Sequence, residues 1–105
     1  HSFPSELASD VDICIGWNND WSKPSDALIE KIKGYFEGFN YKVAFNAPYS
    51  NSITPDSRHK YHSLMLEINK RIYMNEKTLK LLGSSYKFNI AMQYLYKNIL
   101  DKWKY

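Results

Sequence analysis

Apolar residues are arranged along this chain in short runs and helical repeats that alternate with polar stretches. Residues 1–10 contain Pro4 and Ser5 and predict a loop. The first apolar run, residues 11–17, is short and has few polar positions, which predicts a strand buried on both faces. Residues 18–24 are rich in Asn, Asp, Ser and Pro and therefore predict a turn.

An amphipathic helix is predicted after this turn. Ser25 is a typical N-cap residue, and Gly38 and Asn40 predict where the helix ends. The apolar residues between them recur at three- and four-residue spacing. They are Leu28, Ile29, Ile32, Tyr35, Phe36 and Phe39. Residues 41–45 predict a second strand, and the order strand, helix, strand indicates a parallel crossover unit.

The second half of the chain predicts one more strand and one more helix. Residues 46–63 are polar and lack periodicity, which is typical of a functional or disordered connection. Residues 64–68 predict a third strand, and Glu67 is its one charged residue. From Ser85 onward a long terminal helix is predicted by apolar residues at helical spacing. They are Phe88, Ala91, Met92, Leu95, Ile99 and Trp103.

Composition limits the classes of protein that fit this pattern. A chain of 105 residues forms one small domain, and the alternation of strands and helices makes it an α/β fold. The net charge is +3 with both signs interspersed, so we expect no nucleic-acid partner. Cys14 is the only cysteine, which excludes an internal disulfide and favours a small buried hydrophobe. No apolar run is long enough for a membrane span and no signal-peptide pattern is present, so we expect a cytoplasmic protein without a membrane partner.

Glu67 is the residue that most clearly suggests chemistry. A carboxylate inside an apolar strand is costly to bury unless it is paired or bound. It either faces solvent, pairs with Lys70 or Arg71, or acts as a general acid and base whose pKa is set by apolar surroundings. The local sequence alone leaves these alternatives open.

Four blocks of the chain add a further signal. They are His1-Ser2-Phe3-Pro4-Ser5, Asp12-Ile13-Cys14-Ile15-Gly16, Asn46-Ala47-Pro48-Tyr49, and Leu66-Glu67-Ile68-Asn69-Lys70-Arg71-Ile72-Tyr73-Met74. Each resembles a stretch of the N-formylglutamate amidohydrolase family, and they come in the family's order. The family typically shows His-Ser-(Tyr/Phe)-Pro, Asp-Ile-Cys-(Leu/Ile)-Gly, Asn-x-Pro-(Tyr/Phe) and Glu-(Ile/Leu/Val)-Asn-Arg-x-Leu-Tyr-Met. The resemblance covers about residues 1–75.

This resemblance implies a fold similar to that of the zinc carboxypeptidases, with a mixed sheet flanked by helices in three layers. The family's early metal-ligand motif precedes the stretch that matches residue 1. We therefore expect residues 1–105 to be the C-terminal portion of one catalytic domain, with the N-terminal half absent. The exposed edge of such a partial sheet is expected to pair with the N-terminal portion or with a second copy.

The resemblance also implies an activity and its residues. The reaction is zinc-dependent hydrolysis of the amide bond of a small N-acylated amino acid, such as N-formyl-L-glutamate, to formate and glutamate. His1 matches a Zn²⁺ ligand, and Glu67 matches the carboxylate that takes a proton from the attacking water. Arg71 is a candidate for binding the substrate carboxylate, with a structural ion pair as an equal alternative. The candidates for hydrogen bonds to the substrate are Asn46, Tyr49 and Thr54.

Several features depart from the family pattern or fit a different function. The segment 17–22 has two tryptophans where the family tends to have Gly-Thr, and Ser50-Asn51-Ser52 stands where the family often has glycines. Both departures bear on which substrate is bound more than on the type of reaction. His59 and His62 are three residues apart, but they are expected at a surface or pocket rim rather than on a metal. The chain alone is expected to be inactive, and the alternative function is a catalytically inactive fragment or an interaction module.

Overall fold

The chain forms a mixed α/β fold, as predicted, in a computed structural model that describes residues 2–7, 10–47 and 62–101. Its main sheet has four strands in the order β1 (Ser2–Phe3), β4 (Met65–Asn69), β2 (Ile13–Gly16) and β3 (Val43–Phe45). The pairs β1–β4 and β2–β3 are parallel, whereas β4 and β2 are antiparallel, so the sheet is mixed. A separate antiparallel hairpin consists of β5 (Met74–Asn75) and β6 (Lys80–Leu81).

The predicted parallel crossover unit is confirmed. The helix α1 (Asp26–Gly38) connects β2 to β3, and Ile13 lies beside Val43 in the parallel pair. The Ser25 hydroxyl oxygen accepts a hydrogen bond from the Leu28 amide at 3.2 Å, which caps the helix as the sequence predicts. Just past the end of α1, Asn40 takes a left-handed conformation with φ = 64°, which turns the chain back toward the sheet.

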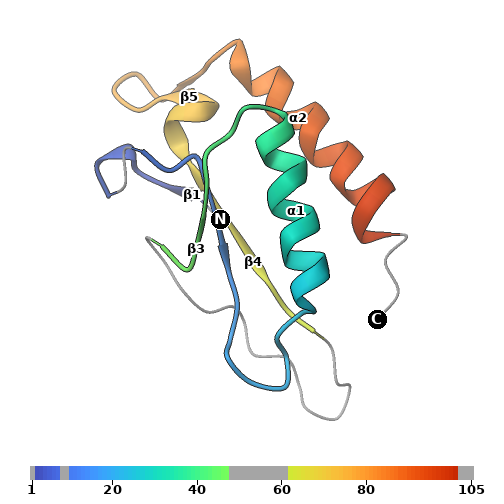
Figure 1. Cartoon of the computed structure of the whole chain (residues 1–105). Coiled ribbons are helices and arrows are strands. Elements are labelled where there is room, and N and C mark those ends of the chain that lie inside the picture. The colour runs from blue at the N-terminus through green and yellow to red at the C-terminus, as the bar shows by residue number, and fades with distance from the viewer. Residues whose placement is uncertain (1, 8–9, 48–61, 102–105) are drawn as a thin grey trace.

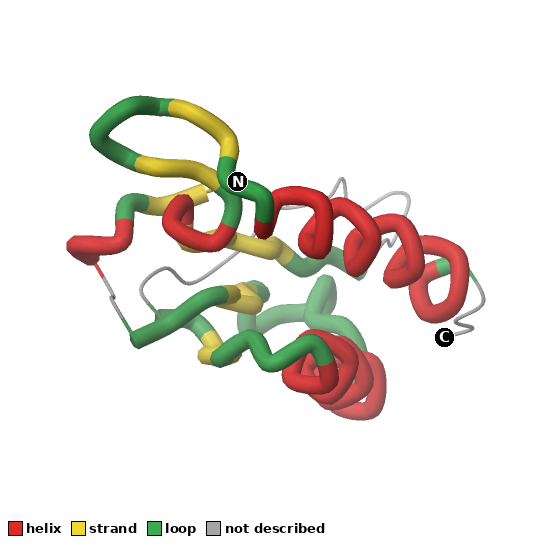
Figure 2. Tube along the Cα trace, turned by 90° about the horizontal axis from the view of Figure 1, so that it is seen from above, coloured by secondary structure: helices red, strands yellow, loops and turns green. Residues whose placement is uncertain are grey.

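The core lies on one face of the sheet. In β2 and β4 the apolar residues alternate, so that Ile13, Ile15 and Ile68 share this face. The helix α1 contacts β2 and β3, and α2 (Ser84–Leu95) contacts α1 and the 3₁₀ helix η2 (Lys70–Ile72). Both helices lie on the same side of the strands (Figures 1 and 2). The residues that α1 and α2 contribute to this buried core are Leu28, Ile32, Phe36, Ala91 and Leu95.

A hydrogen bond joins the two helices directly. The Tyr35 hydroxyl donates to the carbonyl oxygen of Ala91 at 2.6 Å. Beyond Leu95 the chain continues as a π-helical turn, Tyr96–Leu100, in which Ile99 is buried. The predicted contribution of Trp103 lies outside the described residues. Because both α-helices of the described residues cover one face, a second layer of α-helices is not among residues 2–7, 10–47 and 62–101.

One sequence prediction about local structure is wrong, and one element of the structure was not predicted. Residues 1–10 were predicted as a loop, but Ser2–Phe3 forms β1 and Ser5–Leu7 forms the 3₁₀ helix η1. A two-residue strand is too short to show the alternation by which strands are recognised, although Phe3 is fully buried. The β5–β6 hairpin was also not predicted, because its turn has no glycine and places Leu79 in a left-handed conformation with φ = 59°.

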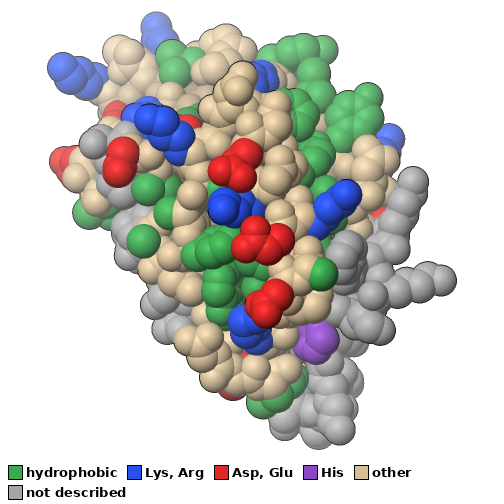
Figure 3. Space-filling model, viewed as in Figure 1, with side chains coloured by type: hydrophobic (Ala, Val, Ile, Leu, Met, Phe, Trp, Pro, Cys, Tyr) green, Lys and Arg blue, Asp and Glu red, His purple; other side chains and the backbone are tan. Residues whose placement is uncertain are grey.

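The surface of the described residues has mixed charge. Figure 3 shows Lys and Arg side chains interspersed with Asp and Glu side chains on the face viewed in Figure 1. None of the helices in the described part of the chain is both long and apolar enough to cross a bilayer.

Candidate active site

Glu67 is buried in the middle of β4, with 7% of its surface exposed. It lies directly opposite Cys14 in the antiparallel pair of β4 with β2. Neighbouring side chains on a strand alternate between faces, so Glu67 and Cys14 lie on the face opposite to Ile13, Ile15 and the helices. The alternative that Glu67 faces solvent therefore does not describe this structure.

The surroundings of Glu67 change its acidity. Burial raises the pKa of its carboxyl group above the ordinary value for glutamate, because desolvation disfavours the charged form. Among the described residues no hydrogen bond or ion pair reaches its carboxylate; in particular, neither Lys70 nor Arg71 forms an ion pair with it. A carboxyl group with a raised pKa can exchange protons closer to neutral pH, which suits a general acid and base.

Arg71 forms an ion pair with Asp12. The Nη2 atom of Arg71 donates to Oδ1 of Asp12 at 2.7 Å, and 39% of the Arg71 side chain is exposed. The other oxygen of Asp12, Oδ2, accepts a hydrogen bond from the Lys42 amide at 2.8 Å. The carboxylate therefore connects the start of β2, the start of β3 and the end of β4. This is the structural ion pair that the sequence left open beside a role in substrate binding.

Asn46 directly follows β3 and takes a left-handed conformation with φ = 54°. Its amide donates to the carbonyl oxygen of Ile15 at 2.9 Å, and its Oδ1 accepts a hydrogen bond from the Trp17 amide at 3.1 Å. These contacts hold the carboxyl ends of β2 and β3 together. Ligands often bind at this edge of parallel strands, so the position is compatible with a role in binding, but the side-chain oxygen already has a partner.

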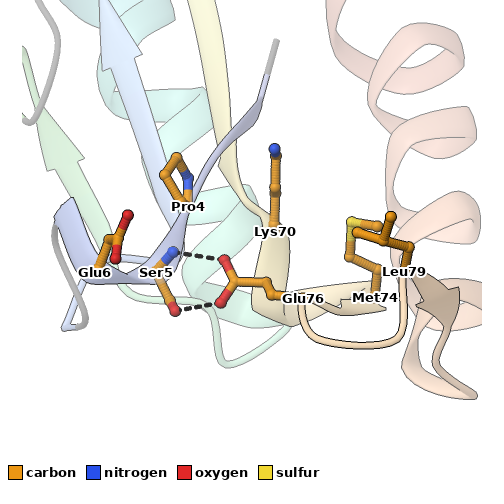
Figure 4. Close-up of a pocket in the computed structure, with 7 residues that line it drawn as sticks. All are labelled: Pro4, Ser5, Glu6, Lys70, Met74, Glu76 and Leu79. Carbon is orange, nitrogen blue, oxygen red and sulfur yellow. Dashed lines mark hydrogen bonds between the residues drawn. The ribbon is translucent and has the colours of Figure 1, made fainter.

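A pocket of about 320 Å³ lies beside β1 and η2. Its lining residues are Pro4, Ser5, Glu6, Lys70, Met74, Glu76 and Leu79 (Figure 4). Ser5 donates two hydrogen bonds to the Glu76 carboxylate, from its amide at 2.7 Å and from its hydroxyl at 2.5 Å. These two bonds lower the pKa of Glu76. We call this pair the Ser5–Glu76 clasp, because it ties the segment after β1 to the β5–β6 hairpin.

Three of the four blocks recognised in the sequence thus meet in space, since β1, β2 and β4 are neighbours in one sheet. A comparison with protein-family models gives a match to N-formylglutamate amidohydrolase over residues 1–74. The chain belongs to the N-formylglutamate amidohydrolase family. All four blocks lie within the matched residues, whereas Glu76 and α2 lie beyond them.

The fold is similar to that of a solved member of this family, the crystal structure of N-formylglutamate amidohydrolase from Ralstonia eutropha JMP134. The TM-score is 0.75 at 20% sequence identity, and the alignment covers 90% of this chain. The chain spans 38% of the length of that protein. A search of curated proteins gave no match.

Three of the residues that the family resemblance singled out lie outside the described residues. They are the candidate zinc ligand His1 and the candidate substrate-binding residues Tyr49 and Thr54. His59 also lies outside them, whereas His62 is exposed just before β4. Their roles stay predictions.

No group of three or more His, Cys, Asp or Glu side chains that could hold a metal ion occurs within the described ranges of the chain. A catalytic zinc requires three protein ligands and an open position. The described residues therefore do not supply a complete ligand set, and a site that includes His1 needs further ligands from elsewhere.

Sequence reasoning did not identify the structural roles of two residues, Asn69 and Glu76. Asn69 is fully buried, and its side chain accepts a hydrogen bond from the Arg71 amide at 3.1 Å, the pattern of an Asx turn. Asn at the end of an apolar strand is a sequence signal for this turn. Glu76 offered no comparable signal, because its partner Ser5 is 71 positions away in the sequence.

Proposed function

We propose that this chain forms part of an enzyme that hydrolyses the amide bond of a small N-acylated amino acid, converting N-formyl-L-glutamate to formate and glutamate. Membership of the family and the similarity to a solved N-formylglutamate amidohydrolase support the reaction class. The observation that carries the proposal is the burial of Glu67 within the family's Glu-Ile-Asn segment.

The proposed role of Glu67 is to move one proton. Water adds to the carbonyl carbon of the amide, Glu67 accepts a proton from this water, and the proton passes to the nitrogen as the C–N bond breaks. The same group acts first as a base and then as an acid, and burial moves its pKa in the direction that suits both roles.

We further propose that the reaction depends on Zn²⁺, with His1 as one ligand. When bound, the ion would supply a Lewis acid that polarises the amide carbonyl. Because the described residues hold no group of three ligands, the remaining ligands would come from outside them. This agrees with the proposal that the chain is the C-terminal portion of a zinc-carboxypeptidase-like domain, which is supported by its span of 38% of the solved relative.

For the substrate we propose contacts from Arg71 and Asn46, together with Tyr49 and Thr54. An Arg guanidinium has five N–H donors, so Arg71 can contact a substrate carboxylate while it keeps its bond to Asp12. A cytoplasmic location also stays part of this proposal.

The proposal is tested by the zinc content and formate release of this chain alone and of the natural protein in its full encoded length. We expect stoichiometric zinc and formate release from the full-length protein, with zinc lost on His1→Ala and catalysis lost on Glu67→Gln while zinc is kept. Zinc in neither form, together with no formate release, would contradict the proposal and leave an inactive member or an interaction module.

A further inference from the structure

Asn69 combines complete burial with hydrogen bonds to two separate segments. It is the last residue of β4, and none of its surface is exposed. Its amide donates to the carbonyl oxygen of Asp12 at 2.8 Å, and its Nδ2 donates to that of Val11 at 2.8 Å. Its Oδ1 accepts a hydrogen bond from the Arg71 amide at 3.1 Å. The side chain therefore fixes both the segment before β2 and the turn after β4.

These bonds extend the pairing of β4 with β2 beyond its last register pair, Ile13 with Ile68. Register matters here, because a slip by one residue moves every side chain of a strand to the other face. Such a slip would place Glu67 on the helix-covered face, in contact with the apolar core. The bonds of Asn69 to Val11 and Asp12 stabilise the register that avoids this.

Glu67 depends on its strand for its position. Its side chain projects from the middle of β4, so the register of this strand sets the face of the sheet on which the carboxylate lies. Asn69 is two positions further along and lies on the same face of the strand. The Arg71–Asp12 ion pair also joins these segments, but the Arg71 side chain is 39% exposed and such pairs contribute little. Of these two connections between the end of β4 and the segment before β2, the one made by Asn69 is buried.

We propose that Asn69 is a positioning residue for Glu67, which it holds on the buried face opposite Cys14 by fixing the β2–β4 register. This inference deepens the proposed function and rests on the role of Glu67 given there. Asn69 itself is not expected to contact the substrate.

The test on this chain follows the cross-strand pairing of Glu67 with Cys14 by NMR, through the nuclear Overhauser contacts between these two residues, in the wild type, Asn69→Ala and Asn69→Asp. The Asp variant keeps an acceptor for the Arg71 amide but removes the donor to Val11. We expect the contacts between Glu67 and Cys14 to weaken or disappear in both variants, while the spectra stay those of a folded protein. Asn69→Ser, which keeps a donor and an acceptor, should restore part of these contacts.

The matched control is Ser25→Ala, which removes a hydrogen bond of similar strength at the cap of α1. It should lower stability and leave the contacts between Glu67 and Cys14 unchanged. Unchanged contacts between Glu67 and Cys14 in the folded Asn69 variants would overturn the inference. So would a failure of all Asn69 variants to fold, because it would assign Asn69 to stability alone.

In the full-length protein, Asn69→Ala should lower kcat roughly 10- to 100-fold with little change in KM, while Ser25→Ala leaves both unchanged. If the wild-type protein releases no formate, the proposed function fails, and the NMR contacts between Glu67 and Cys14 still decide whether Asn69 positions Glu67.

Discussion

Glu67 and Cys14 face each other directly across the antiparallel pair of β4 and β2. Opposed residues in such a pair have Cβ atoms about 4.5–5.5 Å apart. Cys14 is fully buried and behaves as a small hydrophobe in such a place. The carboxyl group thus shares its face of the sheet with an apolar neighbour, which favours the protonated form and accounts for part of the desolvation that raises its pKa.

Replacing Glu67 with Gln should stabilise the fold at neutral pH. The pKa of Glu67 is raised in the folded state, so its protonated form favours folding, and this contribution is lost as the pH rises from the ordinary value of 4.5 through the raised one. The gain on Glu67→Gln should therefore be larger at about pH 8 than at about pH 4. Urea denaturation of both proteins at the two pH values measures it, and a gain independent of pH would contradict it.

Tyr35→Phe should lower the free energy of unfolding by about 1 kcal/mol. The change removes the 2.6 Å hydrogen bond from the Tyr35 hydroxyl to the Ala91 carbonyl, which joins α1 to α2. Tyr86→Phe is the matched control, since Tyr86 is 72% exposed and should lose nothing measurable. Equal values for the two variants in urea denaturation would show that the bond does not contribute.

The Asp12–Arg71 ion pair should contribute less than about 1 kcal/mol, because the Arg71 side chain is partly exposed. Asp12→Ala should cost more than Arg71→Ala, since it also removes the acceptor of the Lys42 amide. A double-mutant cycle measures the coupling. The pair Lys23–Asp26, in which Asp26 is 89% exposed, is the comparison and should show weaker coupling.

The Ser5–Glu76 clasp should open in acid. The pKa of Glu76 is lowered by the two bonds from Ser5, so the clasp favours folding above the ordinary value of 4.5 and is lost as the pH falls through the lowered pKa. The Ser5 amide resonance should therefore titrate with a midpoint below 4.5. In Glu76→Gln the acid shift should vanish, whereas Glu6→Gln, a charge change in the same pocket, should keep it.

The sequence predicts the elements whose residues repeat with a clear period. The crossover unit is confirmed because α1 has an apolar stripe, a capping Ser25 and a stop at Asn40, all local signals. The prediction of β4 is also confirmed, because the apolar run of residues 64–68 is likewise a local signal. The short strand β1 and the β5–β6 hairpin were not predicted, since two-residue strands depend on distant partners rather than on their own pattern.

The candidate site was predictable only in part. Family motifs identify Glu67, and the structure adds its burial and its register opposite Cys14. The contacts of Asp12 with Arg71 and of Ser5 with Glu76 join residues 59 and 71 positions apart. No local sequence pattern predicts a contact between residues so far apart in the sequence. The roles of His1, Tyr49 and Thr54 stay predictions.

The strand order has a consequence for the route by which the chain folds. Among the strands of the described residues, β1 comes first in the sequence and joins the sheet through β4 alone. During synthesis β2, α1 and β3 can associate as soon as they emerge, because their contacts are local. The segment 2–3 must wait until Asn69 has been made. Residues 2–3, although they are translated before β2, β3 and β4, are thus among the last parts of this four-stranded sheet to reach their native place.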